Sequence, residues 1–454
     1  MYLPMRTLRL CLAVLLSTVA LTSAGSQSAS SIAFRGVTVV DVTGGPSRPG
    51  QTVLISGNRI VAVGASRDVR VPSGTRVVDA RGKYVIPGLW DLHTHVTMFG
   101  RSSLALLIAN GVTGIRDMGA VHFAHAKAWR DSIARGLILG PRMRIASPVV
   151  ENPNWLRFAR ESYEKAGAST EWARERFGPS TADEAVRFVD SVVALGADHI
   201  KVRNWPAAAV AQALVTRARE RDIPVVGHAN LPFPRVGVSS FEHSVFPSHT
   251  ANPAMIDTLF RIWADSGTAY VPTLVTWSSR EIPLDTLRAR LDRARTPIYR
   301  YVRAAQLEDW RKAYDARRFE TPTDWTAVIQ ADKRNLKRLK SLGVQILTGT
   351  DPAIPTAIPG FAMHDEMAEL VRLADMTPRE ALAAATIGPA RFLRLADSLG
   401  TVAPGNVADL VLLDADPLVD VGNTRRIHAV VANGRLLDRA TLDRLLAAVE
   451  RDAK

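Results

Sequence analysis

The segment IPGLWDLHTHV, residues 86–96, begins like a buried strand and ends in two histidines that one residue separates. In a β-strand, residues i and i+2 point to the same face, so we expect the side chains of His93 and His95 to lie side by side. Two imidazoles on one apolar face can bind a metal ion together, or they can be core histidines with hydrogen-bond partners. The motif alone leaves both interpretations open.

Polar side chains that could join such a site stand at the ends of four further apolar runs. They are Lys201 after GADHI, His228 after IPVVG, His243 after SSFE and Asp351 after VQILTGT. Each could be an ordinary surface residue, but together with the first two histidines they favour one shared site. Imidazoles and carboxylates suit Zn²⁺ and its neighbours in the first transition series. Four histidines and one aspartate exceed the three protein ligands usual for one catalytic zinc, which favours two metal ions.

Two divalent metal ions would suit the hydrolysis of an amide. A water molecule with its pKa lowered toward about 7 is a nucleophile at neutral pH. A metal ion stabilises the oxyanion of the tetrahedral intermediate, and a carboxylate within hydrogen-bond reach can transfer the protons. Lys201 fits poorly, because its ammonium group, with an ordinary pKa of about 10.4, would repel a dication.

The middle of the chain alternates apolar strand-like runs with helical patterns, which predicts an α/β fold. The runs lie at residues 85–95, 114–118, 142–147, 199–202, 224–228, 240–243, 269–276 and 344–351. They predict a (β/α)8 TIM barrel over residues 86–399, with the active site at the carboxyl ends of its strands. A doubly wound open sheet is the alternative, but no Gly-rich phosphate loop follows the first strand. Arg-rich helices around residues 287–318 form a long insertion that could cover the site.

Both ends of the remaining chain read as short strands separated by Gly-containing turns. Residues 31–85 contain IAFRGVTVV and TVLISG, and residues 400–440 contain NVADLVLLD and HAVVANGRLL. We therefore expect a small β-sandwich domain composed of 31–85 and 400–440.

Residues 1–26 have the pattern of a secretory signal peptide. Arg6 and Arg9 precede the apolar run CLAVLLSTVALTSA, which ends in small residues. The run is shorter than the about 20 residues of a transmembrane helix. We expect export to the periplasm or the medium without a stable membrane anchor, after cleavage between Ala24 and Ala29. Cys11 is the only cysteine, so we expect no disulfides, cysteine nucleophile or thiolate metal site in the mature chain.

The net charge of +13 indicates little by itself about partners. It would suit an anionic substrate, but the arginines are spread along helices and form no block of like charge. No nucleic-acid motif is present. The expected partner is a small molecule, and a homo-oligomer is compatible with the sequence.

The motifs IPGLWDLHTHV, GADHIKV, VVGHA, FEHS and LTGTD, in this order, resemble the amidohydrolase superfamily, in its imidazolonepropionase-like and dipeptidase-like branch. TPREALAAATIGPARFL and LGTVAPGNVADLVLLDADPL resemble the closing segments of that branch, so the resemblance covers about residues 31–440. It implies two divalent ions, with zinc expected, bridged by a carboxylated Lys201. His93, His95 and Asp351 would complete one metal site, and His228 and His243 the other. Asp351 would also be the general base that moves the proton of the metal-bridging hydroxide to the leaving nitrogen.

The chain departs from this branch in its substrate pocket. Members often carry Tyr after the His-Ala of the fifth strand, where this chain has Asn230, and many have Gly-Gly where it has Arg203-Asn204. Arg203 and Asn230 directly follow ligand segments, Tyr270 is on the seventh strand, and His364 follows Asp351 in the loop. These four residues are the candidate substrate contacts, and Arg203 would suit a free carboxylate.

We therefore predict an exported, metal-dependent hydrolase that cleaves an amide in a small substrate such as a dipeptide or an N-acyl amino acid. Hydrolysis of a cyclic amide or a lactone is the alternative. A deaminase is disfavoured, because superfamily deaminases carry a Glu shortly after the fifth-strand His and residues 229–235 contain none. A non-catalytic binding protein is disfavoured because the ligand set is complete.

Overall fold

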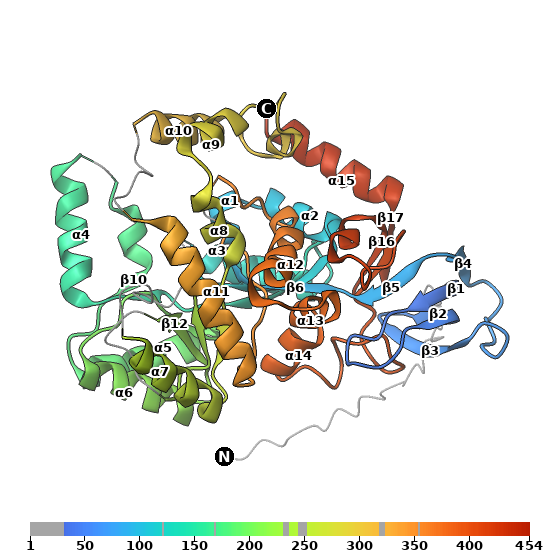
Figure 1. Ribbon diagram of the computed structural model, residues 1–454, viewed down its shortest axis with the longest axis horizontal. Helices are drawn as coiled ribbons and strands as arrows, with labels where there is room; N and C mark the ends of the chain where they lie inside the picture. Colours follow the sequence, from blue (N-terminus) through green and yellow to red (C-terminus); the bar gives the residue numbers. More distant parts are fainter. Residues whose placement is uncertain are drawn as a thin grey trace, which may run out of the picture.

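The computed structural model describes residues 31–119, 122–167, 169–229, 236–243, 252–316, 323–352 and 355–454. The predicted signal peptide and Asn230 lie outside these residues. Within them, helices surround parallel β-structure, and a further sheet lies at one end of the molecule (Figure 1).

One eight-stranded sheet contains strands from both ends of the chain. In sheet order these are β17 (Arg435–Asp438), β16 (Ile427–Ala432), β15 (Leu410–Leu413), β5 (Tyr84–Pro87), β1 (Ser31–Val39), β2 (Arg48–Ser56) and β3 (Arg59–Ala65), and β4 (Arg76–Asp79) pairs with β1. The expected sandwich is thus one hydrogen-bonded sheet. β1 pairs first with β4 and then with β5, and its register against β2 shifts after Arg35 and again after Val37. Such bulges bend a sheet, so a single sheet can curve around its own apolar core.

Strand β15 joins this sheet to the rest of the molecule. All four of its residues are buried. Leu410 and Leu412 pack into the core of the eight-stranded sheet, whereas Val411 and Leu413 pack into the main core. The alternation of a strand therefore gives β15 two apolar faces, one for each core.

Two parallel sheets form the middle of the chain. One contains β6 (Leu89–Thr94), β7 (Val112–Asp117) and β8 (Arg142–Ile145), in this order. The other contains β10 (Arg176–Phe177), β9 (Val149–Val150), β11 (Ile200–Val202), β12 (Val225–His228), β13 (Ser240–Glu242) and β14 (Ala269–Val271). Every residue of β6, β7, β11, β13 and β14 is buried, as expected of parallel strands that helices cover on the outside.

Within the described ranges, the two parallel sheets do not form one closed barrel, yet backbone hydrogen bonds connect them. The amide of Ser147, between β8 and β9, donates to the carbonyl of His199, just before β11, at 2.8 Å. The segment 344–351, which was predicted as the eighth strand, pairs with β14 through a single isolated parallel β-bridge between Ile346 and Tyr270. It also hydrogen-bonds β6, since the amide of Asp351 donates to the His93 carbonyl at 2.7 Å.

The predicted first strand is divided in two at Gly88. Before it, β5 pairs with β15 in the eight-stranded sheet, and after it β6 pairs with β7. A Cβ on Gly88 would lie 1.9 Å from Oγ1 of Thr113, so only glycine lets the chain pass this close to β7. The prediction of one continuous strand over residues 85–95 was wrong, because the alternation of apolar residues does not show where a strand changes its partner.

Helices and short 3-10 turns connect and cover these strands. They are α1 (Val96–Phe99), α2 (Ser102–Ala109), α3 (Phe123–Ala134), α4 (Pro153–Lys165), η1 (Glu171–Glu175), α5 (Ala182–Leu195), α6 (Ala208–Glu220), α7 (Pro253–Ser266), α8 (Leu274–Ser278), η2 (Ser279–Glu281), α11 (Trp325–Ser341), α12 (Phe361–Ala374), α13 (Pro378–Ala384), α14 (Ile387–Phe392) and η4 (Val421–Arg425). Side-chain caps begin several of them, and Thr377 and Glu380 form a capping box at α13. Among the described residues, no helix has the length and apolar character needed to span a membrane.

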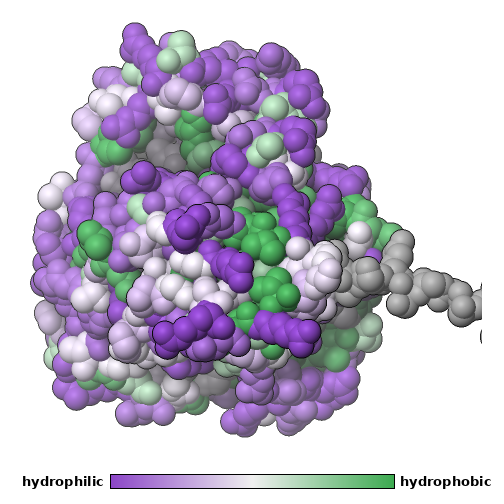
Figure 2. Space-filling model, turned by 90° about the vertical axis from the view of Figure 1, so that its right-hand side faces the viewer, coloured by the Kyte–Doolittle hydropathy of each residue, from purple (hydrophilic) through white to green (hydrophobic). Residues whose placement is uncertain are grey.

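The helical insertion packs against the C-terminal helix. It contains α9 (Leu284–Arg290), η3 (Pro297–Tyr301) and α10 (Ala304–Asp315), which lie beside α15 (Arg439–Asp452) in Figure 1. Leu287, Tyr299 and Trp310 share a small core with Val449 of α15. Arg293 of the insertion donates to the Ala453 carbonyl at 2.9 Å. Seen from the end with the eight-stranded sheet, the surface is mostly hydrophilic, with small apolar groups between the polar ones (Figure 2).

Candidate active site

Three predicted ligand side chains meet where β6, β13 and the 344–351 segment end. His93, His243 and Asp351 each offer one ligand atom, and these atoms lie within 4.8 Å of one another. Nε2 of His93 is 3.8 Å from Oδ1 of Asp351, and Nδ1 of His243 is 3.8 Å from its Oδ2. Ligand atoms about 2.0–2.1 Å from one tetrahedral zinc ion lie roughly 3.3 Å apart. The donor types and their spacing therefore fit a centre for divalent metal ions.

The other two predicted histidines adjoin this group. Nε2 of His95 lies 3.3 Å from Oδ1 of Asp351. The ring of His228, at the end of β12, packs edge-on against that of His243 with centroids 4.6 Å apart. The ring of His243 is also 4.5 Å from that of His93. The structure thus gathers all four histidines and the aspartate.

Lys201 lies on β11 with only 2% of its surface exposed. Its Nζ is buried and has no hydrogen-bond partner among the described residues. A buried amine without a partner is costly, so this atom is where a further bonded group is to be expected. Burial lowers the pKa of Lys201 to about 8, although Glu242 and Asp351 act in the opposite direction. These features fit the predicted carboxylation of this amine.

Asp351 is held as an anion. Burial alone would raise the pKa of its carboxyl group, but the hydrogen bond from His95 and the charge of Lys201 oppose burial, and the pKa is lowered to about 2. The residue has a φ of 45°, in the left-handed region that L side chains rarely adopt. A carboxylate at neutral pH can bind a cation and can also accept a proton.

Burial keeps the imidazoles of His93, His228 and His243 neutral. It is the largest cause that lowers the pKa of His93 and of His228, and the nearby Lys201 adds to it. Burial likewise lowers the pKa of His243 to about 3, although Asp351 opposes this. Neutral imidazole is the form that binds metal ions, so these side chains are ready for that role at pH 7.

Glu242 contacts the imidazole of His93 and was not predicted as a site residue. This fully buried carboxylate lies 2.8 Å from Nδ1 of His93 and accepts hydrogen bonds from Arg116 at 2.8 Å and Ser240 at 2.6 Å. A carboxylate on the second ring nitrogen orients a histidine and leaves its other nitrogen for a metal ion. The signal in the sequence was a glutamate inside the apolar run SSFEH, since a buried acid requires partners.

Two further buried acids fix the backbone of the site. Asp91 accepts hydrogen bonds from Oγ1 of Thr350 at 2.6 Å and from the Thr350 amide at 3.0 Å, which ties β6 to the segment of Asp351. Burial raises the pKa of Asp91 to about 7, against these hydrogen bonds. Asp117 accepts from the amides of Val96 and Gly119, at 2.9 and 3.3 Å. The Gly119 carbonyl lies 2.5 Å from Nδ1 of His95, so Asp117 indirectly positions that ring.

The three described candidates for substrate contact, Arg203, Tyr270 and His364, differ in their hydrogen-bond and ion-pair partners. Nε of Arg203 lies 2.7 Å from buried Glu151, and its guanidinium stacks over the ring of Trp155 at 4.2 Å. Nη2 of Arg203 is buried and has no hydrogen-bond partner among the described residues. The hydroxyl of Tyr270 donates to the His243 carbonyl at 2.5 Å. Nδ1 of His364 lies 2.9 Å from Oγ1 of Thr424, and both residues are buried. Substrate contact by Tyr270 and His364 remains a prediction, since their observed partners belong to the fold.

Comparisons with known proteins identify the family of this chain. The model of the amidohydrolase family matches residues 84–437. An adenine deaminase of Rubrobacter xylanophilus is 27% identical over 440 residues, 95% of this chain, but this match spans only 61% of the deaminase. An imidazolonepropionase of a Geobacillus species is 25% identical over 403 residues, which is 85% of this chain and 89% of that protein.

Solved structures show the same fold. Bottromycin amidohydrolase has a TM-score of 0.69 and 25% identity, over 93% of this chain and 90% of that one. A Xaa-Pro dipeptidase with bound methionine has a TM-score of 0.66 and 18% identity, over 90% of this chain and all of that one. These likenesses indicate a TIM-barrel-type fold with an additional domain. The predicted resemblance is confirmed: the chain belongs to the amidohydrolase family.

Proposed function

We propose that this protein is an exported amidohydrolase with two divalent metal ions, expected to be zinc, and that it cleaves an amide bond in a small substrate such as a dipeptide or an N-acyl amino acid. The observation that carries the proposal is the buried Nζ of Lys201, which has no hydrogen-bond partner within the described part of the chain, in a site that also gathers four histidines and Asp351. We also infer that the hydrogen bonds between the sheet edges complete an eight-stranded barrel around this site.

The side chains divide into those that hold the ions and those that position them. His93, His95 and Asp351 would hold one ion, His228 and His243 the other, and a carboxylated Lys201 would bridge them. When bound, two such ions acidify a water molecule and polarise the substrate carbonyl. Asp351, anionic at neutral pH, accepts the proton of that water and delivers it to the leaving nitrogen.

Arg203 provides the argument for an anionic group on the substrate. It lies two residues after Lys201, and its Nη2 has no partner among the described residues. A guanidinium can bind a carboxylate through charge-assisted hydrogen bonds. Glu151 and the ring of Trp155 hold the guanidinium in one orientation, which reduces the entropy lost on binding.

A cyclic amide is the second candidate substrate. It is favoured by the similarity to an imidazolonepropionase over 85% of this chain, because an imidazolone ring contains an amide. Adenine deamination is disfavoured by the absence of a Glu from residues 229–235, which directly follow His228.

The test is a substrate panel with two variants. The mature, zinc-reconstituted chain is incubated with dipeptides, N-acyl amino acids, cyclic amides and lactones, and the products are followed by mass spectrometry. Cleavage of open-chain amides that Lys201→Ala abolishes would support the proposal, and Arg203→Gln should raise KM for carboxylate substrates more than for their methyl esters. Turnover restricted to rings would favour the second candidate. A protein that binds no metal and turns over nothing would refute both.

Export is tested separately. The full-length chain is expressed in a Gram-negative host, and its N-terminus is sequenced from the periplasmic fraction. A terminus between residues 25 and 30 is expected, and an intact Met1 in the cytoplasm would contradict export.

A further inference from the structure

A cavity of about 560 Å³ lies at the end of the strands opposite the candidate active site. Trp90, Thr113 and Arg142 line it, and they stand near the amino ends of β6, β7 and β8. Asp409 and Asn433 from the C-terminal part of the chain complete its wall. The cavity therefore lies between the parallel strands and the eight-stranded sheet, a kind of place where ligand sites commonly occur, and its volume is in their usual range.

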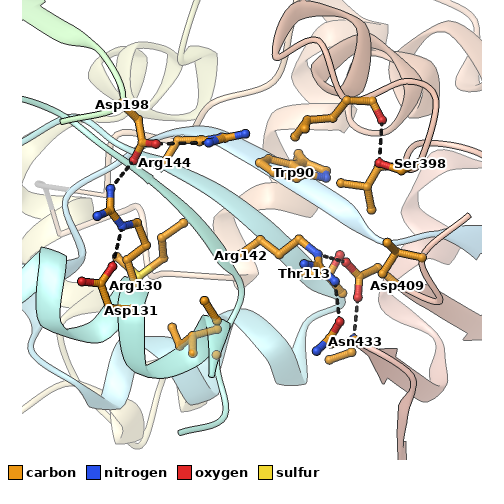
Figure 3. Close-up of a pocket in the computed structure, with 18 of the residues that line it drawn as sticks. Trp90, Thr113, Arg130, Asp131, Arg142, Arg144, Asp198, Ser398, Asp409 and Asn433 are labelled. Atoms are coloured by element: carbon orange, nitrogen blue, oxygen red, sulfur yellow. Dashed lines mark hydrogen bonds and ion pairs between the residues drawn. The ribbon is translucent and has the colours of Figure 1, made fainter. Parts of the chain in front are cut away.

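Two groups of ion pairs face each other across this cavity (Figure 3). On one side, Arg130 and Arg144 donate to the two oxygens of Asp198, at 2.9 and 3.1 Å. On the other side, Arg142 donates to Asp409 at 2.6 Å and to Asn433 at 2.7 Å. Both groups have charged side chains that only partly face solvent, so they form a polar frame for a bound molecule.

Hydrogen-bond donors in this frame outnumber acceptors. The carboxylates of Asp198 and Asp409 each already accept two or more hydrogen bonds. Among the described residues, in contrast, Nη1 of Arg142 and both Nε and Nη2 of Arg144 have no hydrogen-bond partner. Arg59 is a further cationic residue of the lining and Asp131 a further anionic one, so four guanidinium groups stand against three carboxylates. An excess of guanidinium N–H groups favours a carboxylate over a cation or a neutral amide.

The rest of the wall is apolar. Trp90 is 2% exposed and packs on Gly114, where a Cβ would come within 2.2 Å of the indole ring, so its position is fixed. The other apolar side chains of the lining are Ile133, Met143, Leu395, Leu399 and Val407. The partly exposed aliphatic side chains among these provide a surface for an aromatic or branched hydrocarbon body.

We propose that this cavity is a second ligand site, separate from the candidate active site, for a small monocarboxylate with an aromatic or branched apolar body. The carboxylate binds the unpaired N–H groups of Arg144, and the body packs against apolar side chains of the lining such as Ile133 and Leu395. This proposal does not depend on the proposed catalytic function, because the two sites share no residue.

The probe for this site is 3-phenylpropionate, titrated calorimetrically into the mature, zinc-loaded protein. We expect saturable binding with a Kd below about 1 mM. Arg144→Gln should weaken it by about tenfold, the size of a lost charge-assisted hydrogen bond. Ala134→Trp should also weaken it, since Ala134 is an exposed helical residue at the cavity edge where a larger side chain fits and fills the apolar space. This second variant keeps the test informative if the first one folds poorly.

Two arginine controls identify the site. Arg217 pairs with Asp190 at 2.9 Å outside the cavity, and Arg203 belongs to the candidate active site. Arg217→Gln should leave the affinity unchanged, and Arg203→Gln reports any binding of the probe at the candidate active site. An affinity lost in Arg203→Gln but kept in Arg144→Gln would move the probe to the active site and overturn the proposal, as would the absence of saturable binding. Equal affinity for 3-phenylpropan-1-ol, which lacks the charge, would refute the carboxylate as the recognised group.

Discussion

The buried pair of Arg116 and Glu242 makes the sharpest prediction. Arg116 is 1% exposed, and its guanidinium donates to Glu242, to Ser240 and to the Leu92 carbonyl at 2.8, 3.0 and 2.6 Å. Glu242→Gln keeps the shape but removes the only charge that this guanidinium contacts among the described residues. Breaking a buried pair by removal of one partner costs about 3–5 kcal/mol.

This cost can be converted to a melting temperature. With an unfolding entropy of about 2.1 cal/mol/K per residue over roughly 400 residues, a loss of ~3–5 kcal/mol lowers Tm by about 4–6 °C. His93 loses its carboxylate partner at the same time, so the affinity for zinc should fall by roughly 10- to 100-fold. Tm is measured by calorimetry on the metal-free protein, and zinc affinity by competition with a chromophoric chelator.

A double-mutant cycle separates the ion pair from simple loss of packing. Arg116→Met with Glu242→Gln should be less destabilised than the sum of the two single changes, because neither charge is then left buried alone. If Glu242→Gln shifts Tm by less than 1 °C and the two changes add, the reasoning about this pair is wrong. Unchanged zinc affinity would show that Glu242 does not position His93.

Three further predictions follow from buried groups and close contacts. Burial, with the charge of Arg425, lowers the pKa of His364 to about 3. Because the imidazole of the unfolded chain takes up its proton near pH 6.5, the free energy of unfolding should fall by up to roughly 4 kcal/mol as the pH drops from about 6.5 to 3. His364→Gln should make this decline shallower, as measured by urea titrations across that range. Gly88→Ala should destabilise the chain by about 1–3 kcal/mol because its Cβ meets Thr113 at 1.9 Å, and the additional change Thr113→Ala should restore part of the loss of Tm. Removing zinc with a chelator should abolish turnover but leave the far-ultraviolet circular dichroism unchanged, and zinc at 100 times its Kd should raise Tm by about 3 °C relative to the metal-free protein.

Much of the fold could be predicted because the spacing of the apolar residues and the length of the apolar runs indicate where strands and helices lie. The apolar runs at 114–118, 142–147, 199–202, 224–228 and 240–243 correspond to β7, β8, β11, β12 and β13, and the two β-like ends share one sheet. The break at Gly88 could not be predicted, because it depends on Thr113 of the neighbouring strand. The single sheet in place of the expected sandwich could not be predicted either. It depends on β4 and β5 both pairing with β1, and these contacts between distant segments do not show in the local sequence.

The candidate site shows the same division between local and tertiary information. Residues at strand ends could be found individually, since a parallel arrangement brings such ends together. Their supporting partners could not: Glu242 lies 149 positions from the ring that it holds, and Thr350 lies 259 positions from Asp91. Arg203 was predicted at the mouth of the site, but its pairing with Glu151 and stacking on Trp155 depend on the loops around α4.

Backbone strain explains why these ligands can converge although their strands end at different places. His243, Thr273 and Asp351 all have a positive φ, of 67°, 51° and 45°. A left-handed residue turns its side chain away from the path of the strand, and each such position costs of order 1–3 kcal/mol. Hydrogen bonds among the same residues offset this cost, since Thr273 contacts His243 at 2.8 Å and the Asp351 amide donates to His93. Three of the seven described non-glycine residues with a positive φ therefore lie where the side chains must approach one point, and the fully buried strands that precede them supply the stability that maintains this strain.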